Sequence, residues 1–552
     1  MKRLKKQPSA IIAGGALLTT LLATSLVGCE PAKQSTKQPA KLADKNQSET
    51  RCQLAHMPTV NQVAYTAAEA LPGYCLVTGT IEDEINFEVR LPEEWNGRFV
   101  MSGGGGFVGD VVNYVDAAFP GKHYATAGTD TGHRGHPLDA SWAIDHPQRL
   151  ENFGGRAVHL TTETAKQVIE HYYGKASDRN LFYGCSRGGG QGLIAAERYP
   201  HDYDLIIAGA PAYNWTHYLG GHFSMISNQM FPDPAQTSHA LIGEEQWQLV
   251  HNAVMAQCAS DLPIHKGLIS EPWQCDFDVA SLACSDDQDS DCLSEAQVKV
   301  LSLIYDGAYD SHGNLIAPGF YPGAEIAEAG VQRWLAGGTD ALQLDNFQTS
   351  VTTSYSAPHT PNFSYAFGQG IMRDMVFNGS WERLAYDFDQ LDQDTAKVAK
   401  QLNIAGTDLS EFRNAGGKLM MWTGLRDMAI SPASTIKYYQ HLVAQDPAVI
   451  DDVRLFLMPG VDHCSGGDGP FWVDFLNEAE QWLDTGDAPT EVLALGGNES
   501  DGFASRSKLC AYPDVLEYDG EGELLDPESY HCREVKYPPM FVSQDNVRGL
   551  VF

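Results

Sequence analysis

The chain has 552 residues, of which 43% are hydrophobic and 20% are charged. This composition supports a large buried core and excludes an intrinsically disordered chain, and the length fits one large domain with an insertion or two domains. The formal net charge of −34 argues against nucleic acid as a partner, because an acidic surface repels a polyanion.

The first 28 residues have the composition of an export signal. A basic start precedes an apolar run that is short for a membrane span and ends in Leu26-Val27-Gly28-Cys29. These four residues resemble a bacterial lipobox, which is cut before a cysteine that then receives a diacylglycerol. We predict a lipoprotein signal peptide at 1–28, lipidation of Cys29 and a polar tether at 29–51. The mature protein would be lipid-anchored to a bacterial membrane, facing the periplasm or exterior, or, as the alternative, simply secreted.

Apolar runs that end in glycine-rich turns indicate the strands of a buried sheet. Between some of these runs, apolar residues recur at helical spacing. One such segment stops at Gly174. Strands are expected within 98–110, 123–133, 179–184 and 203–212, and helices within 153–174 and 188–200. This alternation predicts a mostly parallel, doubly wound α/β sheet.

The middle of the chain breaks this pattern. Residues 214–404 are aromatic and rich in loops, and sheet-like sequence returns at 416–427 and 451–464. We interpret 52–213 and 405–552 as two parts of one discontinuous core, and 214–404 as an inserted lid domain.

Residues Gly184-Cys185-Ser186-Arg187-Gly188 fit the pattern G-x-S-x-G between a predicted strand and a predicted helix. A sharp turn at this point projects the serine hydroxyl beside a helix N-terminus, and the flanking glycines avoid a steric clash. Ser186 is therefore the candidate nucleophile.

A serine nucleophile needs a base, and His463 follows the last predicted core strand. His133 and His136, which also lie near a strand end, are its competitors. In an α/β hydrolase the chain order is serine, acid, histidine. We therefore predict the α/β-hydrolase fold, disulfide-rich and with a large inserted lid domain.

The acid of such a triad should lie in a loop between Ser186 and His463. Asp427 follows the predicted strand that ends at Gly424, so its carboxylate would fix the tautomer of the imidazole. Asp130 precedes the serine in the chain, and Asp462 adjoins the histidine, where neighbouring side chains point apart. We therefore choose Asp427 over these two.

Ten cysteines follow Cys29, and an even number in an exported chain indicates disulfides. Eight of them form short-range couples: Cys52 with Cys75, Cys258 with Cys275, Cys284 with Cys292, and Cys510 with Cys532. Cys185 and Cys464 remain. A bond between them would bring their neighbours Ser186 and His463 close together; the alternative is a pair of unpaired buried thiols.

An oxyanion formed at Ser186 would need two N–H donors. One is expected from the amide of Arg187, at the start of the helix, and the other from the glycine loop 102–109. Within that loop Gly106 is our first choice and Gly105 our second.

Together these motifs resemble the tannase and feruloyl esterase family, which also includes mono(hydroxyethyl) terephthalate hydrolase. The resemblance extends from about Cys52 to about Pro538 and rests on "GCSRGGGQGL", "TGLRDMAISPASTIKYY", "VDHCSGG" and "LCAYPDVLEYDGEG". It implies a carboxylic ester hydrolase that acts on esters of aromatic acids, phenolic or terephthalic, through an acyl-enzyme on Ser186. It also implies that Asp427 and His463 complete the triad, that Cys185 and Cys464 clamp it, and that residues 214–404 cover the acyl group.

Two other functions stay open. The chain could be a general carboxylesterase or peptidase on the same fold, or a catalytically silent surface binding protein. Specificity would lie in the lid, where Trp273, Phe320, Trp334 and Phe363 could belong to the core or to the pocket.

The resemblance implies a structural calcium in the lid, but Ala259, Leu262 and Lys266 stand at the expected ligand positions. Calcium requires a cage of oxygen ligands, so we predict that this site is lost and that the protein has no cofactor or metal. The Lys266 charge would take the place of the ion.

Asp287, Asp289 and Asp291 alternate as in an EF-hand, but Cys292 and Val298 replace its glycine and glutamate, which favours a disulfide-stapled surface loop.

A second departure from the family is Arg187, followed by Gly190, where relatives often have threonine and then arginine. A cation beside the nucleophile would favour an anionic substrate, or Arg187 would pair with a surface acid. The sequence leaves both hypotheses open.

Overall fold

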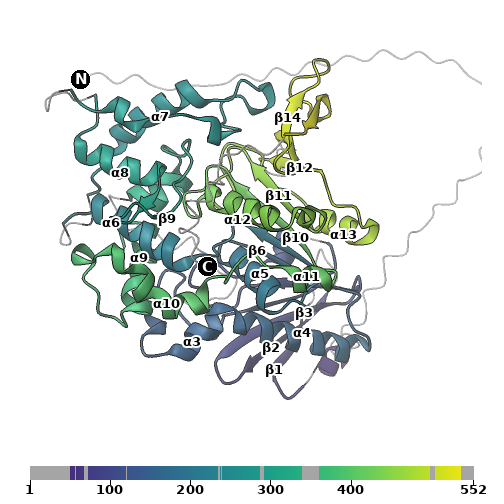
Figure 1. Ribbon diagram of the computed structural model, residues 1–552. Coiled ribbons are helices and arrows are strands. Elements are labelled where there is room, and N and C mark those ends of the chain that lie inside the picture. Colours follow the sequence, from purple (N-terminus) through teal and green to yellow (C-terminus); the bar gives the residue numbers. More distant parts are fainter. Residues whose placement is uncertain are drawn as a thin grey trace, which may run out of the picture. The chain divides into compact units, whose positions relative to one another are not determined.

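A nine-stranded sheet forms the centre of the computed structural model, with the strand order β1-β2-β3-β5-β4-β6-β7-β10-β11 (Figure 1). The structure describes residues 50–55, 57–66, 73–119, 121–233, 237, 239–285, 291–337, 360–497 and 504–535. The predicted signal peptide, Cys29 and most of the tether lie outside these residues, as do Asp287 and Asp289.

The last six strands of this order run parallel. Most of their side chains are buried, as expected for strands covered on both faces. Their bounds are β4 Arg98–Ser102, β5 Ala125–Thr129, β6 Arg179–Cys185, β7 Leu205–Gly209, β10 Lys418–Gly424 and β11 Val453–Met458. Each strand expected from the sequence is present, and the carboxyl ends of these strands meet at one edge of the sheet.

An antiparallel extension, absent from our predictions, continues the sheet beyond β5. Its strands are β1 Val60–Thr66, β2 Tyr74–Ile81 and β3 Ile85–Pro92, and β2 alternates between buried and half-buried positions. The disulfide Cys52–Cys75 ties the preceding segment to β2. The sheet is therefore mixed rather than purely parallel.

Helices cover both faces of the sheet, which makes the protein α/β. Neighbouring residues of β7 show the two faces: Ile206 packs in the core of α4, α5 and α12, and Ile207 packs in the core of α13. The bounds are α4 Ala157–Tyr173, α5 Arg187–Arg198, α12 Pro432–Gln445 and α13 Phe475–Thr485, with the short α2 Val115–Ala118 and α3 Pro147–Glu151.

A helical segment, here called the insert (residues 210–417), joins β7 to β10 and gathers beside the sheet (Figure 1). It contains α6 Phe223–Met230, α7 Glu244–Cys258, α8 Glu295–Tyr305, α9 Phe363–Gln369, α10 Leu391–Leu402, α11 Ser410–Asn414 and the hairpin β8 Ala308–Tyr309 with β9 Leu315–Ala317. Buried side chains of the insert, such as Trp215 and Phe223, belong to the same hydrophobic core as α4 and α5.

The C-terminal residues form two small antiparallel pairs that the sequence analysis did not anticipate. These are β12 Glu491–Gly496 with β13 Ser505–Cys510, and β14 Val515–Tyr518 with β15 Tyr530–Arg533. The disulfide Cys510–Cys532 joins the two pairs.

Candidate active site

Ser186 lies at the turn between β6 and α5, at the carboxyl edge of the sheet. Its backbone has φ 62° and ψ −123°, a left-handed conformation that non-glycine residues adopt at a cost. A Cβ atom at Gly184 would approach the backbone of Gly188 to 2.6 Å, so the sharp turn requires glycine there. The sequence thus accepts local strain to present the serine hydroxyl beside a helix N-terminus.

His463 and Asp427 meet in the loops that follow β11 and β10. Nδ1 of His463 lies 2.8 Å from Oδ2 of Asp427, and the other carboxylate oxygen accepts the N–H groups of Ala429 and Ile430 at 2.7 and 2.9 Å. Asp427 is fully buried. The carboxylate therefore has a fixed orientation and can hold one tautomer of the imidazole.

The competing acids are engaged elsewhere. Asp130 accepts hydrogen bonds from Asn86 and Gly132, and Asp462 faces Arg426.

The competing histidines are engaged too. His133 lies 2.9 Å from the carbonyl oxygen of Phe107 and stacks on Trp142, and His136 accepts the N–H of Leu138.

A disulfide joins Cys185 to Cys464, with an S–S distance of 2.03 Å and Cα atoms 5.9 Å apart. These cysteines adjoin Ser186 and His463, so the bond draws the two loops together. Nε2 of His463, the ring nitrogen that Asp427 leaves free, lies 3.6 Å from Sγ of Cys464. The free nitrogen therefore lies beside the disulfide that joins the two loops. The structure also forms the other four pairs, Cys52–Cys75, Cys258–Cys275, Cys284–Cys292 and Cys510–Cys532.

The glycine loop after β4 leaves few free amides. Gly103 donates to the carbonyl oxygen of Tyr183, and Gly104 donates to Oε1 of the buried Gln191 at 2.9 Å. Phe107 and Val108 donate to other backbone carbonyls.

Among the hydrogen bonds of the described residues, the amides of Gly105, Gly106 and Arg187 find no acceptor within the protein. These are the three amides that the sequence analysis selected as donors to an oxyanion, which stays a prediction.

Aromatic side chains of the insert cover His463. The ring of Trp334, in the segment η8 (Glu328–Ala336), meets the imidazole edge-on at 5.1 Å between centroids. Phe363 and Phe367 of α9 pack on Trp334 at 5.0 and 5.9 Å, and Phe107 of the glycine loop lies 4.9 Å from Phe367.

Two of the four aromatic candidates from the sequence, Trp334 and Phe363, thus lie near His463. Trp273 packs on Tyr512, and Phe320 stacks on Phe223. The sequence analysis missed Phe107 and Phe367, because their place depends on contacts between the core and the insert.

The side chain of Arg187 is fully buried and points away from the surface. Its Nη2 donates to the carbonyl oxygen of Phe153, and its guanidinium lies 4.3 Å above the ring of Phe153 and 5.3 Å from that of Trp215. Burial lowers the pKa of Arg187 to about 9. Pairing of Arg187 with a surface acid is therefore wrong, because the side chain is fully buried and donates to a backbone carbonyl.

At Gly190, a Cβ would lie 2.0 Å from the Ala212 carbonyl oxygen, so this backbone admits no side chain there.

The residues at the expected calcium position do not fit that ion. Ala259 and Leu262 offer no side-chain oxygen, and Lys266 is an exposed cation. His265 is buried instead, with its ring nitrogens 3.0 Å from Oγ of Ser270 and 2.9 Å from Oγ of Ser507. Calcium needs six to eight oxygen ligands, and the side chains at the three expected ligand positions supply none of them.

A different group in the insert has the spacing of metal ligands. Asp310, His312 and Asp389 each bring one ligand atom within 4.8 Å of the others. Both carboxylates already accept backbone N–H groups, Asp310 from Asn314 and Asp389 from Ser311.

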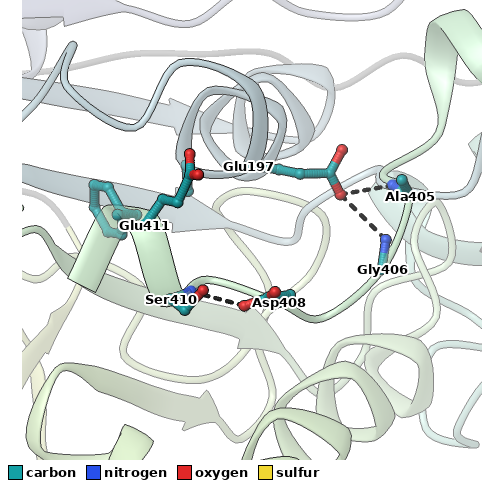
Figure 2. A pocket seen from close by; sticks show the side chains of 8 residues that line it. Glu197, Ala405, Gly406, Asp408, Ser410 and Glu411 are labelled. Atoms are coloured by element: carbon teal, nitrogen blue, oxygen red, sulfur yellow. Dashed lines mark hydrogen bonds between the residues drawn. The ribbon is translucent and has the colours of Figure 1, made fainter. Parts of the chain in front are cut away.

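A surface pocket of about 370 Å³ lies at the opposite end of α5 (Figure 2). Glu197 accepts the N–H groups of Ala405 and Gly406 there, and Asp408 accepts that of Ser410. A helix of 12 residues is about 18 Å long, so this acidic pocket is separate from Ser186.

Within the described ranges, no helix combines the length and the apolar composition needed to cross a membrane.

The sequence and the fold resemble those of known esterases. The model of the family "Tannase and feruloyl esterase" matches residues 72–533. The chain is 28% identical to probable feruloyl esterase B-1 of Aspergillus oryzae, over 83% of this chain and 82% of that protein. It is also 28% identical to mono(2-hydroxyethyl) terephthalate hydrolase of Piscinibacter sakaiensis, over 85% and 86% of the two chains. The crystal structure of feruloyl esterase B from Aspergillus oryzae superposes with a TM-score of 0.74 at 26% identity, over 88% of this chain and all of that one. The chain therefore belongs to the tannase and feruloyl esterase family and is a carboxylic ester hydrolase.

Proposed function

We propose that the protein hydrolyses esters of aromatic carboxylic acids, phenolic or terephthalic, through an acyl-enzyme on Ser186. One observation carries the proposal: His463 is hydrogen-bonded to the buried Asp427 and tied through the Cys464–Cys185 disulfide to the residue beside Ser186. The names of the relatives, feruloyl esterases and a terephthalate half-ester hydrolase, support the aromatic acyl group.

In the first step, Nε2 of His463 accepts the hydroxyl proton of Ser186 while Oγ attacks the ester carbonyl. The negative charge that develops on the carbonyl oxygen is met by the amide of Arg187 and by that of Gly106 or Gly105. Collapse of the intermediate breaks the bond to the alcohol, which leaves with the proton from His463.

In the second step, His463 removes a proton from water, which attacks the acyl-enzyme. The acid is released, and the proton returns to Ser186. Asp427 stays a carboxylate throughout and stabilises the imidazolium that forms in each step.

The fold assigned to this mechanism is the α/β-hydrolase fold, with its lid inside the insert. Trp334, Phe363 and Phe367 reach the neighbourhood of His463 from the insert. Flat aromatic walls of this kind favour an aromatic acyl group by stacking and edge-to-face contact. We assign the acyl ring to this wall, and the lid to residues 214–404.

We also propose that the protein is exported, lipid-anchored through Cys29 or secreted. Five disulfides support export, because disulfides persist in oxidising compartments. The basic and apolar composition of residues 1–28 supports a signal peptide.

The test is hydrolysis of methyl ferulate, methyl gallate, mono(2-hydroxyethyl) terephthalate, a short aliphatic ester and a peptide amide by the protein from residue 30 onward. The parent should cleave an aromatic ester at least tenfold faster than the aliphatic one, and Ser186→Ala should lose about 10⁴-fold or more in kcat. Ser410→Ala is the matched control. Ser410 lines the pocket beside the end of α5 that is remote from Ser186, and this variant should keep parental activity.

Preference for the aliphatic ester or the amide would replace the proposal with a general esterase or a peptidase. If the correctly folded parent cleaves none of these compounds, the hypothesis of a binding protein remains.

A further inference from the structure

An ion pair lies beside the Asp427–His463 hydrogen bond. Nε of Arg426 lies 3.2 Å from Oδ1 of Asp462, and the two side chains are 11% and 4% exposed. Arg426 precedes Asp427 in the chain, and Asp462 precedes His463. The same two loops are thus joined twice, by the hydrogen bond and by the ion pair.

The backbones of the two loops are also in contact. Arg426 donates its N–H to the carbonyl oxygen of Val461 at 3.0 Å, and Leu425 donates to that of Met458 at 3.0 Å. A Cβ at Gly424 would lie 2.4 Å from the carbonyl oxygen of Val461, which shows how closely the strand ends approach. The ion pair therefore acts between two segments that are packed against each other.

We propose that Arg426 and Asp462 are a positioning pair for the reaction, which holds the loop of the acid against the loop of the base as the disulfide Cys185–Cys464 holds the base against the nucleophile. Asp462 and Cys464 flank His463 directly, so the base is secured on both sides. This inference rests on the proposed roles of Ser186, Asp427 and His463.

The charges around Asp462 show why Arg426 matters to it. Burial raises the pKa of Asp462, Arg426 is the strongest influence in the opposite direction, Asp468 and Asp427 raise the pKa further, and Arg333 of the insert lowers it. Without Arg426, a buried carboxylate would face two like charges. It would then protonate or move, and His463 would move with it.

The contact between Nε of Arg426 and Oδ1 of Asp462 is an ion pair rather than a hydrogen bond. Both atoms are buried, and neither has a hydrogen-bond partner among the described residues. Arg426 also contacts the exposed Asp468. The guanidinium therefore contacts two acids, Asp462 and Asp468, that lie on either side of His463 in the chain.

The same two strands supply a matched control. Arg413 precedes β10 and Asp452 precedes β11, and their Nε and Oδ2 atoms lie 2.8 Å apart with side chains 17% and 19% exposed. This pair joins the same strands at their amino ends, remote from His463. If Arg426 had only a structural role, removal of either arginine would have the same effect on kcat.

The experiment compares Arg426→Ala with Arg413→Ala in the full mature chain, on whichever ester the parent cleaves best. We expect Arg426→Ala to lower kcat about 10- to 100-fold with KM within about twofold, because displacement of a base by about 1 Å costs that much in rate. Arg413→Ala should lower Tm without lowering kcat. Arg426→Lys should restore kcat to within about threefold of the parent.

The double variant Arg426→Ala/Asp462→Ala, compared with each of its two single variants, tests the coupling. Removal of the stranded carboxylate should leave kcat no lower than in Arg426→Ala alone, which is non-additive behaviour for two residues in contact. Equal kcat in Arg426→Ala and Arg413→Ala, or additive losses in the double variant, would overturn the inference.

A measurement without turnover separates this inference from the proposed function. The low-field NMR signal of the His463 Nδ1 proton, assigned by its loss in Asp427→Asn, should shift or broaden in Arg426→Ala and stay unchanged in Arg413→Ala. An unchanged signal in both would refute the positioning role even if the protein cleaved no ester. If Arg426→Ala does not fold, Arg426→Gln replaces it in both measurements.

Discussion

At the scale of single residues, the site combines groups that sequence motifs reveal with groups that only folding brings together. Ser186, Asp427 and His463 each follow an apolar run that is recognisable as a strand, and the G-x-S-x-G motif, chain order and the cysteine beside His463 select them. Trp334 has no such signal, because its edge-on contact with His463 depends on how the insert packs.

Replacement of Trp334 by alanine should change specificity more than catalysis in general. We expect kcat/KM for methyl ferulate to fall about tenfold or more, because the aromatic ring of this substrate loses its packing partner. For a short aliphatic ester, kcat/KM should fall by only a few fold. Trp273→Ala is the matched control, since this tryptophan of the insert packs on Tyr512. Equal losses for both esters in Trp334→Ala would remove the tryptophan from the acyl site.

At the scale of elements, the sequence analysis found the parallel strands and missed the antiparallel ones. Strands such as β6 and β7 are short apolar runs closed by glycine, a signal that a single sequence carries. The sequence of β3 alternates apolar and polar residues from Ile85 to Leu91, a strand signal that our sequence analysis passed over. The sequences of β1 and β2 have no such regular period, and their pairing depends on their partner strands. The two C-terminal strand pairs are short and half-exposed, so their sequences also carry a weak signal.

The Cys258–Cys275 loop is held by a disulfide and a hydrogen bond. Its disulfide closes the segment, and His265 reaches Ser507 of β13. We propose that this loop works without calcium. Dialysis against EDTA should leave Tm and kcat unchanged, and metal analysis after dialysis against calcium chloride should find substoichiometric calcium. A lower Tm in EDTA, restored by calcium, would contradict this proposal.

At the scale of the whole molecule, buried histidines connect stability to pH. Burial lowers the pKa of His133, His222 and His265 to about 4 each. In the unfolded chain these groups titrate near 6.5, so between pH 6.5 and pH 4 the unfolded state binds more protons than the folded state. Folding stability should therefore be complete above pH 6.5 and decline towards pH 4.

Each histidine contributes up to about 1.4 kcal/mol per pH unit in this window. Asp130 acts in the opposite direction, because burial raises its pKa to about 6. Urea unfolding at pH 7.5, 6 and 5 should show the decline, and His265→Asn should have a shallower pH dependence than the parent. A parent stability that rises as the pH falls from 6.5 to 5 would refute this assignment.

The central claim is that Ser186 carries the acyl group of an aromatic ester. Intact-mass spectrometry of the protein, quenched in acid during turnover of a slow aromatic ester, tests it most directly. We expect an added mass equal to one acyl group, located by peptide mapping to the segment that contains Ser186 and absent in Ser186→Ala. Turnover of the ester with an acyl group on another residue, or an equal adduct in Ser186→Ala, would contradict the account.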